Sequence, residues 1–235
     1  MLNSELTVIS VTYNNREGLR RTLDSILNVR TKPAQIIIID GGSVDGTHEM
    51  VEKYKNLLPV VFLSDKDEGI YDAMNKGKML VSTNFIHYLN GGDEIFGDPY
   101  FAIKEECRLP VCIYDPITFK SWFDRLKLGG FGYCHQGVIF KSSHDFYETS
   151  YELAADFDLI VSHFPFGLKK LPVVKGGWVR YQLGGVSSIR SGHGDSEIIE
   201  VSRRRLGILK YAAIRFEILI KNAIPRKIRR AIFAR

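Results

Sequence analysis

Cysteine is scarce in this chain of 235 residues, and long apolar runs are missing. The three cysteines (Cys107, Cys112 and Cys134) are too few and too irregularly spaced for a disulfide framework or a zinc site, which favours a reducing compartment. No stretch approaches the ~18 apolar residues that a membrane span needs. The N-terminus enters an apolar run without a basic segment before it, so we expect no signal peptide.

Acidic residues are almost absent from one end of the chain. Residues 203–235 hold eleven Lys or Arg and a single acid, Glu217, for a net charge of +10, so the total of +5 leaves residues 1–202 at −5. An acidic body and a basic tail predict two surfaces with different partners. Aromatic residues are not interleaved with these cations as single-stranded nucleic acid would require, and we expect no nucleic-acid partner.

Glycine is also missing where a dinucleotide-binding fold needs it. Residues 6–11 are apolar enough for a buried strand, but Thr12 to Asn15 contains no glycine of a G-x-G-x-x-G fingerprint. A helix is expected from about Glu17, with Leu19, Leu23, Ile26 and Leu27 as its apolar stripe. Pro33 should end the connection, and Ile36 to Ile39 has the composition of a central strand covered on both faces. Strand, helix and strand at this spacing predict a parallel sheet.

The alternation of strands and helices continues to residue 89. Val60 to Leu63 is a third expected strand, and Ile70 to Leu80 is a helix with Ile70, Met74, Gly77 and Leu80 inward. Asp72 and Lys76, four residues apart on its outer face, are expected to form an exposed ion pair. Phe85 to Leu89 is a short apolar run with the length of a buried strand.

Polar loops follow these strands. Asp40 to Thr47 (D-G-G-S-V-D-G-T) follows the second strand, and Asn90 to Glu94 (N-G-G-D-E) follows the last. Ligands of open α/β sheets bind in the crevice at the carboxyl ends of the strands, where an Asn and an acidic pair could hold a divalent cation beside a phosphorylated ligand. A hairpin turn is the alternative for N-G-G-D-E, because Asn, Gly and Asp favour turns.

Four motifs in this order resemble the family-2 glycosyltransferases of the GT-A fold, which are inverting enzymes that use nucleotide sugars. They are V-I-S-V-T-Y-N-N, I-I-I-I-D-G-G-S-V-D-G-T, D-E-G-I-Y-D-A-M-N-K-G and Y-L-N-G-G-D. The similarity is strong over residues 5–97 and weaker over 133–188, and it is greatest to the branch that builds bacterial exopolysaccharide, colanic acid and O-antigen units. It implies an α/β, GT-A-like, mostly parallel central sheet flanked by helices.

The resemblance also implies which residues contact the donor. Asp40, which ends the second strand, should contact the nucleotide base, and Thr12, Tyr13 and Asn14 should lie beside the nucleotide. The same motifs place Asp67, Asn75 and Asn90 in the donor site. The family usually has D-x-D where this chain has Asn90-Gly91-Gly92-Asp93, so only Asp93 remains as the metal-binding acid. One carboxylate with diphosphate oxygens and waters is a normal Mg²⁺ site, and we expect Mg²⁺ or Mn²⁺ as cofactor.

The catalytic base is expected between Tyr151 and Ile160. Leu153, Phe157 and Ile160 follow helical spacing, which places Asp156 beside the apolar stripe, at a cleft edge. An acid at this point deprotonates the acceptor hydroxyl in the family that the chain resembles. Asp158 is the competing candidate and Glu152 a weaker one; a surface position for Asp156 is the alternative without chemistry.

Several segments between residues 98 and 196 are less informative. Five residues could be core or the wall of an acceptor cleft, with core favoured: Tyr114, Pro116, Phe119, Trp122 and Phe123. Tyr133 to Phe140 should be a loop running into a strand, and its His-Gln resembles a segment of the same branch. A further strand pair is expected between Val173 and Tyr181. Gly184 to Ser188 resembles the G-G-V-S segment near the donor site, and His193 is either an exposed loop histidine or a contact for metal or diphosphate.

A helix is expected from Glu197 to Pro225, with cations around an apolar side that comprises Leu209, Ala212, Ala213, Phe216, Leu219 and Ile220. Such a basic amphipathic helix is typical of elements that bind anionic membrane surfaces, and a solvated helix packed on the core is the alternative.

The sequence thus predicts a transferase domain over residues 1–196, with a nucleotide-sugar half (1–97) and an acceptor half (98–196), and a basic tail (197–235). The expected activity is inverting transfer of one sugar from a nucleotide donor, with UDP favoured, to a lipid-linked glycan in bacterial surface polysaccharide synthesis. The expected place is the cytoplasmic face of the cell membrane. The alternatives are a nucleotidyltransferase, which would need a glycine-rich basic loop after the first strand, and a non-catalytic binding scaffold, suggested by the missing D-x-D.

Overall fold

The computed structural model describes residues 1–127, 130–184 and 191–223, and the chain divides into two compact units. The first unit comprises Met1–Val111, Cys134–Tyr147 and Leu171–Tyr181. The second comprises Cys112–Tyr133, Glu148–Lys170 and Gln182–Arg235.

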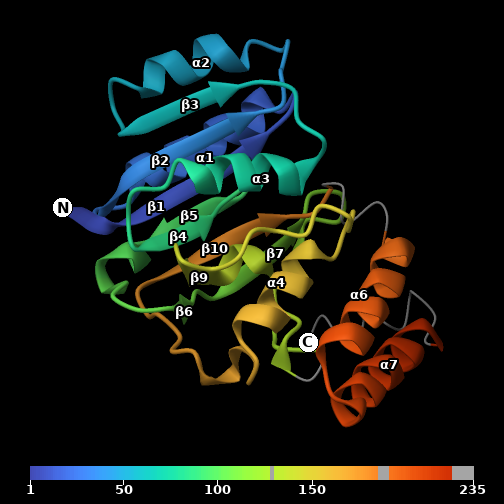
Figure 1. The fold of residues 1–235 in the computed structure, drawn as a ribbon. Coiled ribbons are helices and arrows are strands. Elements are labelled where there is room, and N and C mark those ends of the chain that lie inside the picture. The colour runs from blue at the N-terminus through green and yellow to red at the C-terminus, as the bar shows by residue number, and fades with distance from the viewer. Residues whose placement is uncertain (128–129, 185–190, 224–235) are drawn as a thin grey trace. The chain divides into compact units, whose positions relative to one another are not determined.

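A six-stranded sheet forms the centre of the first unit (Figure 1). Its spatial order is β3-β2-β1-β4-β9-β6. The first four of these strands are parallel, whereas β9 runs antiparallel to both β4 and β6. The bounds of the strands are β1 Leu2–Thr12, β2 Lys32–Asp40, β3 Val60–Ser64, β4 Phe85–Tyr88, β6 Cys107–Arg108 and β9 Val138–Lys141. The mostly parallel α/β sheet expected from the sequence is confirmed.

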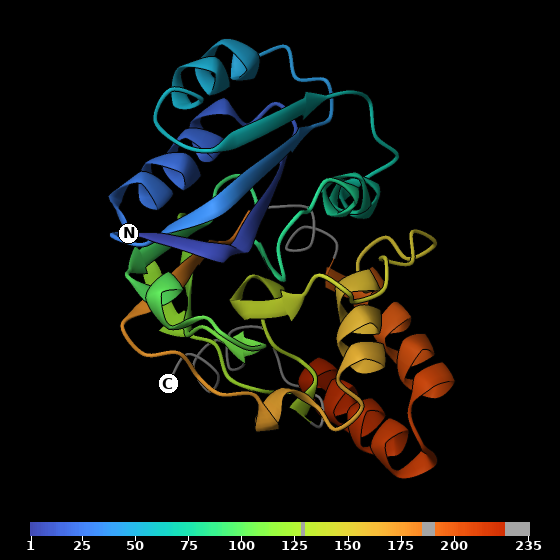
Figure 2. The same cartoon turned by 60° about the vertical axis from the view of Figure 1, so that its left-hand side comes forward.

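Three helices cover the two faces of this sheet. Figure 2 shows α1 (Arg16–Asn28) and α2 (Thr47–Tyr54) on one face and α3 (Ile70–Met79) on the other. The apolar stripe of α1 is buried as its spacing predicts, with Leu19, Leu23 and Ile26 fully covered. Gly77 lets α3 approach the sheet closely, because a Cβ at this position would lie 2.7 Å from Ile9 Cγ2.

Details of these elements differ from the sequence-based expectation. Pro33 lies inside β2 rather than ending the connection before it. Ile70 and Leu80 are exposed, whereas Met74 and Gly77 are buried as expected, together with Tyr71 and Ala73. The helix therefore turns a different part of its surface to the sheet, with Tyr71 and Ala73 covered in place of Ile70 and Leu80. The Asp72–Lys76 ion pair is present at 3.0 Å.

A short antiparallel pair, β5 (Glu94–Gly97) with β10 (Gly177–Gln182), completes the first unit. Phe96 and Trp178 stack across this pair at 4.5 Å between ring centroids. Only one strand, not two, forms in the region from Val173 to Tyr181, since Val173 contributes an isolated bridge to Arg108. Single 3₁₀ turns lie at Pro99–Ala102 and His135–Gly137.

The second unit contains a hairpin and three helices. The hairpin strands are β7 (Val111–Asp115) and β8 (Lys120–Phe123), and a 3₁₀ turn lies at Leu168–Lys170. The helices are α4 (Ala155–His163), α6 (Ser191–Arg205) and α7 (Ile208–Ala223). The core assignment of the aromatic group from Tyr114 to Phe123 is wrong: Phe119 and Phe123 are exposed, and Tyr114, Pro116 and Trp122 are half-buried.

Charged side chains of α6 hold α4 in the second unit. Glu197 accepts hydrogen bonds from the backbone N–H groups of Glu152, Leu153 and Ala154, the three residues immediately before α4. Arg205 binds Asp158 on α4 through two hydrogen bonds of 2.9 and 2.7 Å. Residues 197–205 are therefore packed against the α4 region within the second unit.

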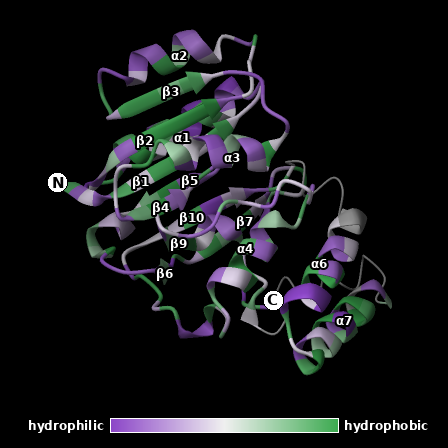
Figure 3. Cartoon of the chain, in the orientation of Figure 1, coloured by the Kyte–Doolittle hydropathy of each residue, from purple (hydrophilic) through white to green (hydrophobic). Residues whose placement is uncertain are grey.

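The expected single helix after Glu197 is two helices. The break falls at Leu206 and Gly207, where the sequence places a glycine between two helical segments. Within α7, Ile214 and Ile218 are buried, while the predicted apolar side is exposed, with Leu209 at 84% and Phe216 at 65%. Figure 3 shows green hydrophobic segments along α7. No helix among the described residues is long and apolar enough to cross a membrane.

Candidate functional site

The loops after β1 and β2 are tied together at the carboxyl end of the sheet. Asn14 donates its backbone N–H to Ser43 Oγ at 2.7 Å, and its side-chain Oδ1 accepts the Val44 N–H at 3.0 Å. The backbone N–H of Arg16 donates to Asp45 at 2.8 Å. Asn14 takes a positive φ of 45°, a conformation that asparagine tolerates better than most residues. The two motifs that the sequence singled out thus form one surface.

Tyr13 and Asp67 converge over Gly41 on this surface. A Cβ at Gly41 would lie 2.7 Å from Asp67 Oδ2 and 3.2 Å from Tyr13 Cδ2, so a larger residue at this position would displace the Asp67 carboxylate. The Tyr13 ring is 65% exposed, and Asp67 is half-buried. An exposed aromatic ring can stack on a flat base. A carboxylate and open backbone can accept hydrogen bonds from that base or from a ribose.

Asp40 is buried below this surface. Its carboxylate accepts hydrogen bonds from the Ser43 N–H (2.9 Å), the Ser43 hydroxyl and the Ser64 hydroxyl (2.7 Å). A carboxylate offers about four acceptor positions, and these three donors leave room for one further contact. Asp40 therefore holds the loop in shape, and its contact with a base stays a prediction.

Asn75 serves a different contact from the one that the sequence suggested. Its amide donates to the carbonyl of Tyr147 at 3.0 Å and accepts the N–H of the same residue at 2.8 Å. This pair of bonds ties α3 to the segment after β9. The structure gives Asn75 a role in holding that segment, and a donor contact by it is a prediction that no observation here supports.

Unpaired oxygens mark the end of β4. Among the described residues, the buried atoms Asn90 Oδ1 and Thr12 Oγ1 have no hydrogen-bond partner. Thr12 lies against the same loop, because a Cβ at Gly91 would be 3.1 Å from Thr12 Oγ1. Unpaired buried oxygens are unfavourable unless a ligand or an ordered water completes them. We therefore regard the loop from Asn90 to Asp93 as the place for a bound group.

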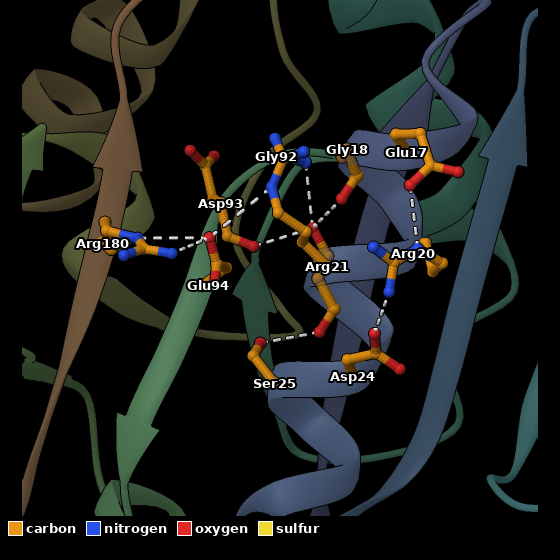
Figure 4. A network of polar contacts seen from close by, with 12 residues as sticks. Glu17, Gly18, Arg20, Arg21, Asp24, Ser25, Gly92, Asp93, Glu94 and Arg180 are labelled. Atoms are coloured by element: carbon orange, nitrogen blue, oxygen red, sulfur yellow. Dashed lines mark hydrogen bonds and ion pairs between the residues drawn. The ribbon is translucent and has the colours of Figure 1, made fainter. Parts of the chain in front are cut away.

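The oxygen donors of this loop fit a hard divalent cation in part. Asp93 is almost fully buried, and its carboxylate is turned away from α1 (Figure 4). Asp93 and the unpaired Asn90 oxygen are of the kind that Mg²⁺ and Mn²⁺ prefer, and substrate phosphates commonly complete such sites. No group of three or more His, Cys, Asp or Glu in the described part of the chain forms a metal site of its own.

Glu94, the second acid of this motif, is engaged in ion pairs. Arg180 of β10 donates two hydrogen bonds to Glu94 Oε1, and Arg21 Nε lies 3.8 Å from the same atom (Figure 4). Of the acidic pair in N-G-G-D-E, Asp93 alone is thus left as a candidate cation ligand. The hairpin-turn alternative fails, because β5 pairs with β10 and not with β4.

Two hydroxyl residues of α1 contact this loop and were missed from the sequence. Thr22 hydrogen-bonds the backbone of Gly92 and Asp93, and Ser25 Oγ accepts the N–H of Ile95 at 3.0 Å. Both lie on the buried face of α1, among Leu19, Leu23 and Ile26. Their place within the apolar stripe of the helix was a signal in the sequence, because a buried hydroxyl needs a hydrogen-bond partner.

Burial and ion pairing distinguish the candidate bases of the second unit. Asp158 is 4% exposed and neutralised by Arg205, with Arg204 at 3.5 Å from it. Asp156 lies half-buried in the first turn of α4, and Glu152 is exposed before that helix. Since a general base must reach solvent or substrate, Asp156 remains the better candidate and Asp158 is a structural ion-pair partner.

Two buried histidines of the first unit, His87 and His135, are structural. His135 of the His-Gln segment hydrogen-bonds Tyr147 Oη at 2.6 Å, and burial lowers its pKa to about 3. His87 contacts Tyr100 Oη and the Gln136 carbonyl, and burial lowers its pKa to about 4. Both imidazoles are therefore neutral at pH 7 and closed to substrate. His193 lies within α6 rather than in a loop, and Gly185 to Ser188 lies outside the described residues.

Residues 7–98 match the sequence model of the family described as "Glycosyl transferase family 2". The chain is 25% identical over 177 residues to a PGL/p-HBAD biosynthesis glycosyltransferase of Mycobacterium bovis, with 67% of this chain and 69% of that protein covered. It is 29% identical over 101 residues to the poly-beta-1,6-N-acetyl-D-glucosamine synthase of Staphylococcus aureus, which covers 42% of this chain. The chain spans only 24% of that synthase and 14% of the glycosyltransferase GlyA of Streptococcus pneumoniae.

Solved structures of other proteins share the fold. S. aureus TarS 1–349 in complex with UDP-GlcNAc superposes with a TM-score of 0.64 at 15% identity, over 98% of this chain and 70% of that one. The mannosyltransferase PcManGT of Pyrobaculum calidifontis, in complex with GDP-Man and Mn²⁺, gives a TM-score of 0.62 at 12% identity, over 98% and 78%. The GT-A-like fold expected from the four motifs is confirmed.

Proposed function

We propose that this chain, whose residues 7–98 are a glycosyl transferase family 2 domain, transfers a single sugar from a nucleotide-sugar donor to a lipid-linked glycan with inversion. Two observations carry the proposal together: Tyr13, Gly41 and Asp67 converge on one surface, and Thr12, next to Tyr13, lies against Gly91 of the N-G-G-D loop. They offer a base-binding surface and, through Thr12, a candidate diphosphate and cation site. The transferase domain is residues 1–196 in this proposal.

The mechanism is one in-line displacement. Asp156 takes the proton from the acceptor hydroxyl as that oxygen attacks the anomeric carbon, and the nucleoside diphosphate leaves from the opposite face. Asp93 and Asn90 would hold Mg²⁺ or Mn²⁺, which neutralises charge on the leaving diphosphate when bound. The surface that Tyr13 and Asn14 expose, with Thr12 and Asp40 buried beneath it, orients the nucleotide.

The groups bound by similar proteins support the choice of donor. TarS binds UDP-GlcNAc and PcManGT binds GDP-Man with Mn²⁺, so a UDP- or GDP-sugar with a divalent cation is the expected pair, with UDP favoured. Titration calorimetry of the full chain with UDP and GDP, each with and without Mn²⁺, tests this directly. The absence of any cation-dependent nucleotide binding would instead favour a non-catalytic scaffold.

Asp40 is expected to act on donor binding rather than on chemistry. Asp40→Ala removes the acceptor of Ser43 and Ser64, which loosens the loop that also holds Asn14. Contacts made equally in the ground and transition states change KM, so we expect the donor KM to rise severalfold more than kcat falls. Steady-state kinetics with varied donor measure this, and a fall in kcat at unchanged KM would place Asp40 in the chemistry instead.

The proposed place of work is an anionic membrane surface, reached through α7. Leu209, Phe216 and Leu219 form the exposed apolar side of this helix, and Arg215 is an exposed cation of the same helix. Exposed apolar side chains with cations favour insertion into the headgroup region of anionic lipid. Residues 224–235, which add five more cations in the sequence, lie outside the described residues.

Substitution within α7 tests membrane binding better than truncation. Removing the chain from Arg203 would delete the partner of Asp158 and the buried Ile214 and Ile218, and would unfold the second unit. The double variant Leu209→Ser/Phe216→Ser leaves these contacts intact and should weaken sedimentation with phosphatidylserine vesicles about tenfold or more, as each apolar side chain contributes roughly 1.5–3 kcal/mol.

The matched control is Phe101→Ser, which removes a comparably exposed aromatic ring from the first unit. It should sediment with vesicles like the wild type. High salt should weaken binding of the unsubstituted chain, because the attraction to lipid is partly electrostatic. A double variant that sediments as well as the wild type would end the membrane hypothesis.

A further inference from the structure

The hydroxyl of Thr22 lies at the centre of the turn that carries Asp93. Thr22 is fully buried on the inner face of α1. Its Oγ1 lies 2.7 Å from the carbonyl oxygen of Asp93, and it accepts the backbone N–H of Gly92 at 2.9 Å. The carbonyls of Asn90 and Gly18 are each 3.2 Å away.

These contacts make the backbone turn around a single oxygen. A hydroxyl has one proton to donate, and the shortest contact assigns that proton to the Asp93 carbonyl. The same oxygen accepts the N–H of Gly92, so Thr22 fixes the peptide group before Gly92 and the peptide group after Asp93, which bracket the turn. Gly92 has a φ of 113°, which lies in the region that other residues rarely adopt. The turn therefore depends on a glycine within it and on a hydroxyl from another element.

The flanking residues of the turn are held by neighbouring side chains. Ser10 donates to the Leu89 carbonyl at 2.6 Å, and Asn15 donates to the Gly91 carbonyl at 2.8 Å. On the far side, Ser25 accepts the Ile95 N–H, and Arg180 binds the Glu94 carboxylate (Figure 4). The first strand and helix thus contact the loop at each end, and Thr22 alone among these side chains bonds the backbone of Gly92 and Asp93.

We propose that Thr22 is the positioning residue of this site: its hydroxyl sets the turn that presents the Asp93 carboxylate to the cation and diphosphate. The inference rests on the proposed function for the identity of the ligand. The N-G-G-D loop has a single acid, so no second carboxylate can bind the cation if Asp93 is misplaced. The orientation of Asp93 therefore matters more here than in a site with two acidic ligands.

The test compares Thr22→Val, which keeps the shape but removes the hydroxyl, with Thr22→Ser, which keeps it. Partners behind a metal ligand typically change metal affinity 10- to 100-fold, so we expect Thr22→Val to raise the Mn²⁺ concentration for half-maximal UDP binding by about that factor. Thr22→Ser should stay within about threefold of the wild type. Nucleotide binding without Mn²⁺ should be unchanged, because Tyr13 and Asp67 lie on other loops.

Ser25→Ala is the matched control, since it removes a buried hydroxyl three residues further along the same face of α1. It should lower the melting temperature without changing Mn²⁺ affinity. Exchange of the Gly92 amide proton, followed by NMR in the absence of metal, should be faster in Thr22→Val and unchanged in Ser25→Ala. If Thr22→Val does not fold, Thr22→Ala also removes the hydroxyl and can be compared with Thr22→Ser, because alanine has a higher helix propensity than valine.

Two outcomes overturn the inference. One is a Thr22→Val variant with wild-type Mn²⁺ affinity and a melting temperature lowered as in Ser25→Ala, which would make Thr22 a packing residue only. The other is an unchanged exchange rate of the Gly92 amide. If the wild type bound no Mn²⁺ with nucleotide, the proposed function would fail, and the exchange rate would still decide whether Thr22 holds the turn.

Discussion

Replacing Asp156 with asparagine should lower kcat by about 10²- to 10⁴-fold, the usual loss when a general base is removed. Asparagine keeps the size of the side chain and can still accept the hydrogen bond that Asp156 receives from the Phe157 N–H at 2.7 Å, so the start of α4 should stay folded. Donor binding should barely change, because every donor-contact residue proposed here lies before position 100. Single-turnover rates and UDP titration on the same preparation separate the two effects.

Asp158→Asn is the control for this variant on the same helix. Position 158 lies about 200° around the helix from position 156, so the two carboxylates cannot face the same atom. Asp158 is paired with Arg205, and we expect its loss to cost about 1–3 kcal/mol of unfolding free energy, a discounted value for a pair whose arginine is partly exposed. The folded fraction should retain near wild-type kcat. An inactive Asp158→Asn beside an active Asp156→Asn would show that the assigned base is wrong.

The sequence predicted the parts of this fold that depend on local patterns. The four isoleucines of β2 and the apolar stripe of α1 gave the βαβ unit correctly, since strand burial and helix periodicity are encoded within short windows. The motifs at the strand ends predicted a common surface, because parallel strands bring their carboxyl ends to one edge. Asn14, Tyr13 and Asp67 lie there as the order of strands requires.

The errors concern contacts that join distant parts of the chain. Nothing within the tail indicated that Arg205 would bind Asp158 or that Glu197 would bind the start of α4, because these partners are more than 40 residues apart. Thr22 and Asn75 could not be assigned for the same reason: their partners lie about 70 residues away. Polar side chains acquire roles through tertiary contacts that periodicity does not encode.

The largest expected effect of a single substitution on the donor site is that of Asp93→Asn. The exchange removes the only charge that the N-G-G-D loop offers to a cation, while the backbone contacts of residue 93 with Thr22 and Asn90 remain. A bound metal is worth several kcal/mol of transition-state stabilisation, so turnover at saturating Mn²⁺ should fall about 10²-fold or more. The melting temperature should hardly change.

Glu94→Gln, one residue further on, separates the loss of a cation ligand from the loss of a nearby charge. Glu94 pairs with Arg180 and Arg21, so its neutralisation should lower the melting temperature and leave the dependence of turnover on Mn²⁺ as it is. Asp93→Asn should show the reverse: an intact fold and a lost response to Mn²⁺. Activity measured over a range of Mn²⁺ concentrations, with melting curves of both variants, decides the assignment. An Asp93→Asn enzyme that kept most of its turnover with the same Mn²⁺ dependence would remove Asp93 from the metal site, and Asn90 with the substrate diphosphate would then have to hold the cation without a protein charge.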